Sequence, residues 1–222
     1  MAGEIVQLVT DDGEAEGDTS PTDGRVVRRQ RNREAVIDAL IALVAEGEND
    51  PSVDAIADRA GVSYRSVYRY FSDRSEMLDA AADRAMQWIR PMLAETLTPC
   101  DVTDELDHRI DGIVDARSEV YVQIAEVART ALRRSATEPK IAEQFIDVRQ
   151  LVREQVRQRF APELAQFEER EAELRVTAID QALDFASLDY VVNVRKHSRD
   201  ELERFMRTQI RLALTVPSPD EW

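Results

Sequence analysis

The sequence predicts an all-α fold of about nine helices, divided into a small N-terminal domain and a larger C-terminal domain. Apolar residues recur at steps of three and four along most of the chain, which is the period of an amphipathic helix. No segment shows the strict alternation of a half-buried strand. Only three of the seven glycines follow residue 24, too few for the hairpins, bulges and phosphate loops of a β-rich or α/β protein.

Composition excludes several classes of protein. A chain of 222 residues with 43% hydrophobic and 33% charged side chains is large enough to form a stable globular core. No run approaches the ~18 apolar residues of a membrane span, and the N-terminus lacks the pattern of a secretion signal. A single cysteine and two separated histidines argue against disulfides and a structural zinc site. We therefore expect a cytoplasmic protein without a metal or cofactor.

Charge is unevenly distributed along the chain. The net charge is −15, and residues 1–24 carry seven acidic side chains and no basic one, so we predict a disordered acidic tail there. Residues 25–33 instead carry five arginines and no acid. A locally basic surface binds a polyanion even on an acidic protein, because salt screens distant charge. This cluster is either an unstructured flank or, as we favour, an arm that reaches DNA phosphates or the minor groove.

The first two helices have clear ends. An apolar stripe over residues 36–44 predicts a helix that ends at Gly47. Ser52 is an N-cap for a short second helix, which stops at Gly61. With a third helix, these elements form a predicted N-terminal domain over residues 25–80.

The third helix carries the functional signal. It is capped by Ser63 and runs to about Phe71, so a short helix, a glycine turn and a second capped helix follow one another as in a helix-turn-helix. At 100° per residue, Val67 and Phe71 face inward, whereas Arg65 and Arg69 face outward. Such a polar face fits the DNA major groove, where arginine can bond guanine bidentately.

Residues 81–222 are predicted to form a second, wholly helical domain. Ser198 and Glu201 form a capping box for its last helix. Pro91 either kinks the fourth helix or ends it near Arg90, where a new helix begins. The fourth helix is predicted to begin near Asp73. Five further helices are predicted over residues 106–113, 120–131, 137–160, 171–194 and 199–215.

The segment from Arg28 to Leu78 resembles the DNA-binding region of the TetR-like bacterial transcriptional repressors. The sequence departs from the family pattern at Arg65, where a small residue is frequent, and at Ser72, where proline is common. Base preference therefore does not carry over from relatives. The pieces that match are AIADRAGVS at residues 55–63, SVYRYF at residues 66–71, Arg74 and Leu78.

The resemblance implies which side chains contact DNA. The equivalents of Tyr68, Tyr70 and Arg74 commonly touch phosphates, and the three positions after the capping serine usually face bases. The alternative for an outward arginine pair is a solvated or ion-paired helix face. The predicted DNA-binding residues, with the arginine cluster and the two caps included, are Arg28, Arg29, Arg31, Ser52, Ser63, Tyr64, Arg65, Ser66, Tyr68, Arg69, Tyr70 and Arg74.

The resemblance also implies that the C-terminal domain binds a small molecule and forms a homodimer through the last two long helices. The helix over residues 171–194 is apolar on two sides, which suits a second copy of the chain. Inward aromatic, methionine and arginine side chains are candidates to line a ligand pocket, with core packing as the alternative for each. They are Trp88, Met92, Arg117, Tyr121, Phe145 and Arg149.

These patterns together predict a DNA-binding transcriptional regulator. The favoured form is a repressor that leaves a palindromic operator when a small molecule binds its C-terminal domain. No catalytic or phosphate-loop motif is present in the sequence, so we do not expect an enzyme. Two alternatives stay open, namely a helical small-molecule-binding or enzymatic domain with a vestigial helix-turn-helix, and a TetR-like activator.

Overall fold

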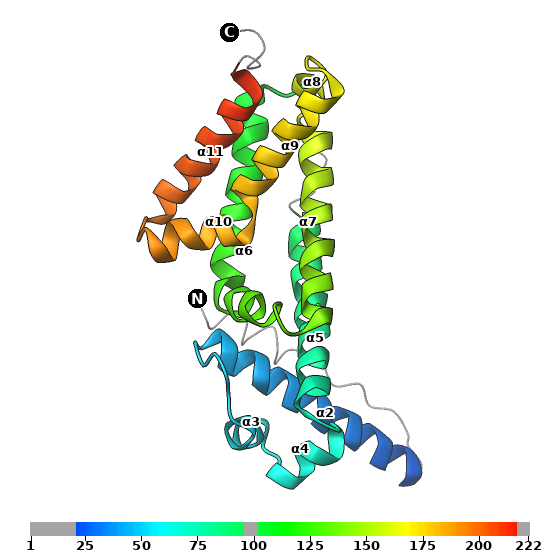
Figure 1. Cartoon of the computed structure of the whole chain (residues 1–222). Helices are drawn as coiled ribbons and strands as arrows, with labels where there is room; N and C mark the ends of the chain where they lie inside the picture. Colours follow the sequence, from blue (N-terminus) through cyan, green and yellow to red (C-terminus); the bar gives the residue numbers. More distant parts are fainter. Residues whose placement is uncertain (1–20, 96–101, 217–222) are drawn as a thin grey trace. The chain divides into compact units, whose positions relative to one another are not determined.

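The computed structural model describes residues 21–95 and 102–216. Within these ranges the chain forms ten α-helices, one π-helix and no strand, which confirms the all-α prediction (Figure 1). Packing divides the chain into two compact units. Unit 1 extends to Ile89 and includes Glu126–Ala142, whereas unit 2 comprises Arg90–Ala125 and the chain from Glu143 onward. The predicted domain boundary after residue 80 separates the expected DNA-binding domain from the expected ligand-binding domain, and it stays a prediction.

The first described helix, α2 (Pro21–Ala45), contains the whole arginine cluster. Residues 25–33 are therefore helical, so the alternative of an unstructured flank is wrong, whereas an arm that reaches DNA stays a prediction. The run is rich in arginine, with no proline or glycine after Gly24, so helix propensity favours this outcome. Of the predicted acidic tail, residues 1–20 lie outside the described residues, and the last four residues begin α2.

Unit 1 is built from α2, α3 (Val53–Ala60), α4 (Tyr64–Tyr70) and the first part of α5 (Arg74–Glu95). Figure 1 shows α3 and α4 as two short helices, and both pack against α2. Each helix contributes apolar side chains to one core, which fixes α4 on the body of the unit. The core includes Val36, Leu40, Ile41, Ile56, Ala57, Val67, Tyr70, Phe71, Met77, Leu78 and Ala81.

Helix α5 continues through Pro91 to Glu95. The alternative in which this helix ends near Arg90 is therefore wrong. Proline removes one backbone donor and displaces the carbonyl four residues earlier. Both Pro91 and Gln87 are exposed, so the freed carbonyl of Gln87 can bond water.

Unit 2 is a bundle of helices around a second core. Its elements are the first part of α6 (Leu106–Arg134), most of α7 (Pro139–Arg159), α8 (Ala161–Leu164), α9 (Glu169–Leu183), α10 (Phe185–Asp189), the π-helix η1 (Tyr190–Val194) and α11 (Arg199–Thr215). Helices α9 and α11 pack against each other (Figure 1). The core includes Ile110, Ile113, Val114, Tyr121, Val152, Val156, Phe160, Val176, Ile179, Leu202, Met206 and Ile210.

Helix α6 is one continuous helix, whereas the sequence analysis predicted two helices in this region. The two predicted helices were residues 106–113 and 120–131, and Arg117 and Ser118 lie between them in the sequence. Both side chains are buried in the middle of α6. These two polar side chains therefore lie inside the helical bundle of unit 2.

The predicted helix over residues 171–194 is three elements, α9, α10 and η1, and this prediction is corrected. The break is at Asp184, whose backbone is extended with φ −67° and ψ 141°. Its Oδ1 accepts a hydrogen bond from the Ala186 N–H at 2.9 Å. The carboxylate thus caps α10 and competes with continuation of α9.

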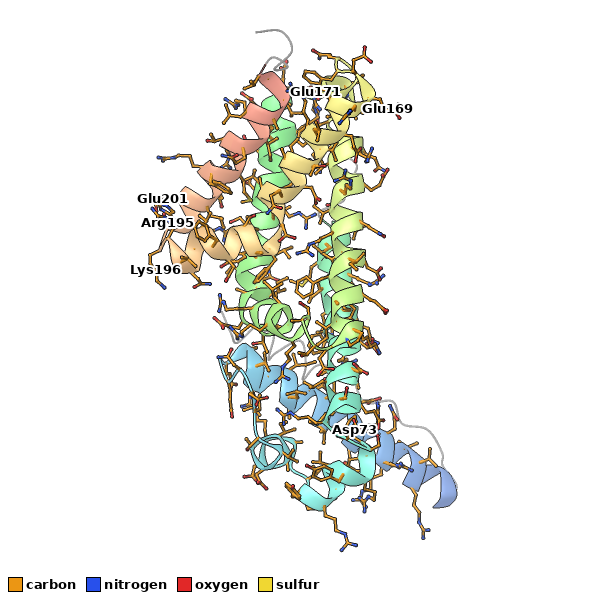
Figure 2. All side chains as sticks on the ribbon, viewed as in Figure 1. Asp73, Glu169, Glu171, Arg195, Lys196 and Glu201 are labelled. Carbon is orange, nitrogen blue, oxygen red and sulfur yellow. The ribbon has the colours of Figure 1, made fainter. Side chains whose placement is uncertain are left out.

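The last helix begins as predicted. Ser198 and Glu201 form the expected capping box at the start of α11. Lys196 lies in the turn before it with a left-handed φ of 60° (Figure 2). The turn therefore reverses the chain between η1 and α11, which brings α11 back against α9.

Candidate nucleic-acid interface

The helix-turn-helix predicted over residues 52–71 is confirmed in its geometry. Ser52 caps α3, and its Oγ accepts the Ala55 N–H at 3.1 Å. Gly61 follows α3 with φ 65° and ψ 30°, a left-handed conformation that glycine adopts without steric cost. Ser63 then caps α4 and accepts the Ser66 N–H at 3.2 Å. Two capped helices separated by a tight turn result.

Helix α4 is anchored through one side. Val67 and Phe71 are each 2% exposed, as the helical spacing predicted. The guanidinium of Arg33, on α2, lies 4.7 Å from the centroid of the Phe71 ring. This contact is within the range of a cation–π interaction and holds the end of α4 against α2.

The opposite side of α4 presents polar and aromatic side chains to solvent. Arg65 is exposed and makes no hydrogen bond or ion pair with any described residue. Tyr64 and Tyr68 are 48% and 49% exposed, and their ring centroids lie 5.1 Å apart. The Tyr64 hydroxyl donates to the Tyr68 hydroxyl at 3.4 Å, which raises the pKa of Tyr64. One turn of α4 thus carries an unpaired cation beside two hydroxyls.

Arginines from α2 extend this exposed surface. The Arg29 Nη2 donates to the backbone carbonyl of Arg69 at 3.5 Å, so the two helices meet at this point. Arg69 itself is exposed and bonds the Ser66 hydroxyl at 3.4 Å. Arg28 and Arg31 are also exposed, without partners among the described residues, and lie three positions apart on α2. Arg29 and Arg69 thus bring basic side chains of α2 and α4 together on a unit of an acidic protein.

The hydroxyl groups of Ser63 and Ser66 form a hydrogen bond with each other, with 2.9 Å between their oxygens. Ser52 and Ser63 mark the N-terminal ends of α3 and α4, where backbone N–H groups favour anions. A phosphate near these ends would meet donors from both the caps and the backbone.

Tyr70 is not on the exposed surface where the resemblance placed it. It is 6% exposed, and its hydroxyl accepts bonds from Asn32 Nδ2 at 3.0 Å and Arg69 Nη2 at 3.1 Å. Both bonds lower the pKa of Tyr70, and the bond from Asn32 has the larger effect. Because the side chain is enclosed, we assign Tyr70 to positioning α4 and withdraw it as a phosphate contact.

Arg74 is also placed differently from the expectation. Its Nη2 donates to Asp50 Oδ1 at 2.5 Å and to the Pro51 carbonyl at 3.0 Å. The side chain therefore binds the loop that precedes α3. Asp73, next to it, caps α5 and accepts the Glu76 N–H at 2.8 Å (Figure 2).

The predicted ligand-pocket residues fall into different surroundings. Trp88 packs in the core of unit 1, with the Arg84 guanidinium 5.3 Å from its ring. Arg149 is exposed and pairs with Asp184 at 2.6 Å. Of the six, Met92, Arg117, Tyr121, Phe145 and Arg149 belong to unit 2.

Two of these residues belong to polar groups inside unit 2. The Tyr121 hydroxyl donates to Asp189 Oδ1 at 3.2 Å. Arg117 is buried and donates to the side-chain carbonyl of Gln155. The sequence analysis missed Gln155, although its position three residues after the inward Val152 on α7 already indicated a buried amide.

The described residues hold no group of three or more His, Cys, Asp or Glu side chains arranged for a metal ion. Among the helices that are described, none has the length and apolar character that a membrane span requires.

Residues 36–81 match the family of bacterial regulatory proteins known as the tetR family. This segment of the chain is TetR-like. The match includes α3, α4 and the apolar residues that hold them, so this helix-turn-helix is similar to the DNA-binding region of the tetR family, which supports a transcriptional regulator. No curated protein sequence matches the TetR-like chain.

Solved structures share the fold of the TetR-like chain. A transcriptional regulator from Rhodococcus sp. Rha1 is similar with a TM-score of 0.60 and 22% identity, over 85% of this chain and 99% of the other. The fatty acid degradation regulator FadR from Bacillus halodurans has a TM-score of 0.54 and 18% identity, over 89% and 97%. The multidrug binding protein EbrR, complexed with imidazole, has a TM-score of 0.54 and 20% identity, over 87% and 98%.

Proposed function

We propose that this regulator is a homodimeric repressor that binds an approximately palindromic operator and leaves it when a small molecule binds unit 2. The observation that carries the DNA-binding part is the exposed face of α4, where Arg65 has no partner among the described residues and the same helix exposes Tyr64 and Tyr68. A guanidinium in this position is ready to bond a base edge, because no ion pair must first be broken.

The role of each side chain follows from its position. Arg65 and Arg69 are one helical turn apart on α4 and reach bases in the major groove, where arginine bonds guanine O6 and N7. Tyr68 donates its hydroxyl proton to a phosphate or a base, whereas the Tyr64 proton bonds Tyr68 and leaves the Tyr64 oxygen to accept from a base. Arg28, Arg29 and Arg31 on α2 add phosphate contacts, together with the N-terminal ends of α3 and α4 at Ser52 and Ser63.

A homodimer supplies the second copy of α4 that a palindromic operator requires. The proposed interface is formed by α11, which is the helix predicted over residues 199–215, and by α9, which covers the first part of the helix predicted over residues 171–194. Leu174 on α9 is 59% exposed and Leu212 on α11 is 49% exposed. Apolar side chains exposed on two helices that pack together are suited to a four-helix interface. The two α4 helices would then address major grooves ~34–36 Å apart.

The ligand-responsive part is supported by two observations. The interior of unit 2 contains polar side chains within an apolar core, as in sites that orient small molecules. A similar structure is that of a multidrug binding protein with imidazole bound, and another is that of a fatty acid degradation regulator. An effector must prefer the conformation that cannot bind DNA, because only differential affinity shifts the equilibrium. Such a regulator works in the cytoplasm, at the nucleoid, and is not an enzyme.

Gel retardation with the DNA that flanks the chain's own gene tests the proposal. Wild-type protein is expected to retard a specific fragment at salt concentrations that abolish binding to random DNA. Arg65→Ala should weaken specific binding about 5- to 150-fold, the range of one bidentate base contact of ~1–3 kcal/mol. Arg59→Ala is the matched control, because Arg59 pairs with Glu46 at 2.6 Å and lies outside the proposed surface. Equal losses in both variants, or no specific fragment, would refute the assignment.

A further inference from the structure

The interior of unit 2 contains three buried arginines, and one of them differs from the others. Arg109 is 3% exposed, pairs with Glu163 and donates to the Arg159 carbonyl at 2.7 Å. Arg175 is 6% exposed, bonds Glu171 at 2.9 Å and donates to the Ala213 carbonyl at 2.6 Å. Each of these two charges is thus compensated by a carboxylate.

Arg117 lacks such a partner. It is 4% exposed, and among the described residues its hydrogen bond runs to the neutral side-chain carbonyl of Gln155. Its Nε is buried and has no hydrogen-bond partner in the part of the chain that the structure describes. Gln155 is itself buried and donates to the Leu93 carbonyl at 3.3 Å, so its amide is fixed in one orientation. A guanidinium with an unsatisfied donor is therefore held in place at the centre of α6.

The neighbouring carboxylates are bound to other cations. Asp180 attracts Arg117 through space, but it forms its ion pair with Arg153 at 3.7 Å. Asp184 pairs with Arg149 at 2.6 Å. Arg159 adds a further positive charge near Arg117. Neither of these carboxylates thus forms a hydrogen bond or ion pair with Arg117 among the described residues.

Arg117 remains charged in this environment. Burial lowers the pKa of Arg117 to about 10, partly offset by the attraction of Asp180. This value lies above neutral pH, so the guanidinium still carries its proton in the cytoplasm. A buried charge of this kind is retained at a cost unless an anion compensates it.

We propose that Arg117 binds the carboxylate of an apolar small-molecule effector within unit 2. The carboxylate accepts from Nε and from one terminal nitrogen, a planar arrangement that guanidinium groups favour. Gln155 is a positioning residue that orients the guanidinium. The apolar body of the effector packs with core side chains of α6 and α7 that lie within four positions of these two residues in the sequence, namely Ile113, Val114, Tyr121, Val152 and Val156. This assignment rests on the proposed ligand response and names the class of ligand.

The test compares carboxylates with their neutral amides. Octanoate, dodecanoate, benzoate and 2-naphthoate are each titrated against full-length protein by calorimetry, beside the matching primary amides. At least one carboxylate is expected to bind tenfold or more tightly than its amide. In Arg117→Met this preference should disappear, while Arg211→Met, which removes an exposed cation of α11, should retain it. No preference in wild type, or a preference that survives in Arg117→Met, would overturn the proposal.

A second variant covers the case in which Arg117→Met does not fold. Gln155→Glu is close to isosteric and places a carboxylate where the Gln155 carbonyl now accepts from Arg117. It should weaken carboxylate binding at least tenfold and leave amide binding unchanged. Undiminished carboxylate binding in Gln155→Glu would contradict the proposal.

DNA retardation separates this inference from the proposed function. If a carboxylate binds through Arg117 but does not release DNA, the site stands and the ligand-responsive repressor fails. If only uncharged compounds release DNA, equally in wild type and Arg117→Met, the repressor stands and this inference fails.

Discussion

The Asp50 carboxylate accepts a hydrogen bond from the Arg74 guanidinium, with 2.5 Å between Oδ1 and Nη2. The same oxygen accepts a second bond from Arg134, near the end of α6. The bond from Arg134, more than that from Arg74, lowers the pKa of Asp50, so this carboxylate is ionised at neutral pH. A DNA phosphate must therefore compete with Asp50 for Arg74.

Replacing Asp50 by asparagine should strengthen DNA binding. The change leaves Arg74 available to a phosphate, so affinity at low salt should rise several-fold and the salt dependence should steepen by about one counterion. Fluorescence anisotropy over a salt series measures both quantities. Glu48→Gln removes a charge from the same loop, where Glu48 has no side-chain partner among the described residues. A change no larger than that of Glu48→Gln would show that Arg74 does not contact DNA.

Tyr68→Phe should reduce DNA affinity about tenfold, or ~1.4 kcal/mol. The Tyr64 hydroxyl donates to Tyr68, which leaves the Tyr68 proton free to bond a phosphate. Because phosphates carry no sequence information, operator and random DNA should lose affinity equally. Tyr64→Phe is the control and should lose less, since its proton already bonds Tyr68. A loss restricted to the operator would instead indicate a base contact.

Asp184→Ala should destabilise the protein by about 1–3 kcal/mol. The side chain supplies the N-cap of α10, worth ~0.5–2 kcal/mol, and an ion pair with the half-exposed Arg149, worth ~0–1 kcal/mol. Asp184→Asn keeps the cap and should lose less. Urea unfolding followed by circular dichroism measures the free energies. Asp200→Ala, an exposed acid in the first turn of α11, should change stability by less than ~0.5 kcal/mol; an equal effect at both positions would contradict the capping role.

The stability of unit 1 should fall in acid through Glu76. Its carboxylate accepts from the Ser72 N–H at 2.7 Å and the Ser72 hydroxyl at 2.9 Å, and the backbone bond is the main reason that the pKa of Glu76 is lowered. A lowered folded pKa adds stability above the ordinary value of 4.5, and this stability is lost as pH falls through the folded value. The stability difference between wild type and Glu76→Gln should therefore shrink below pH ~4.5. Urea unfolding at pH 7, 5, 4 and 3 tests this, and a constant difference would refute it.

Glutamate at the exposed apolar positions of α9 and α11 should dissociate the proposed homodimer. Leu174→Glu and Leu212→Glu place charges where two copies would bury leucine, so sedimentation should show monomers at micromolar concentration. Ile146→Glu on α7 is the matched control, because Ile146 is 52% exposed but lies outside these helices. A dimer that persists in both leucine variants, or that Ile146→Glu also dissociates, places the interface elsewhere.

The helix-turn-helix could be predicted closely from the sequence, because local chemistry determines it. Ser52, Gly61 and Ser63 each specify a helix end through their own backbone or side-chain bonds, and the structure contains all three ends. The capping box at Ser198 was predictable for the same reason. Short-range signals of this kind do not depend on the rest of the fold.

The partners of the polar side chains could not be predicted in this way. Asp50 and Arg134 are 84 positions apart in the sequence, and Arg117 and Gln155 are 38 positions apart. Only the packing of α6 brings either pair together. The break at Asp184 was not predicted, because an aspartate within an apolar stripe is compatible both with a continuous helix and with the N-cap of a new one.

The isolation of Arg65 has a consequence for how this protein changes over evolutionary time. A side chain that supports no other residue can be exchanged without loss of folding stability, so the base recognition that we propose for Arg65 is separable from the integrity of the domain. Operator preference can therefore drift among paralogues, or be re-engineered by randomising codon 65, on a scaffold that stays the same.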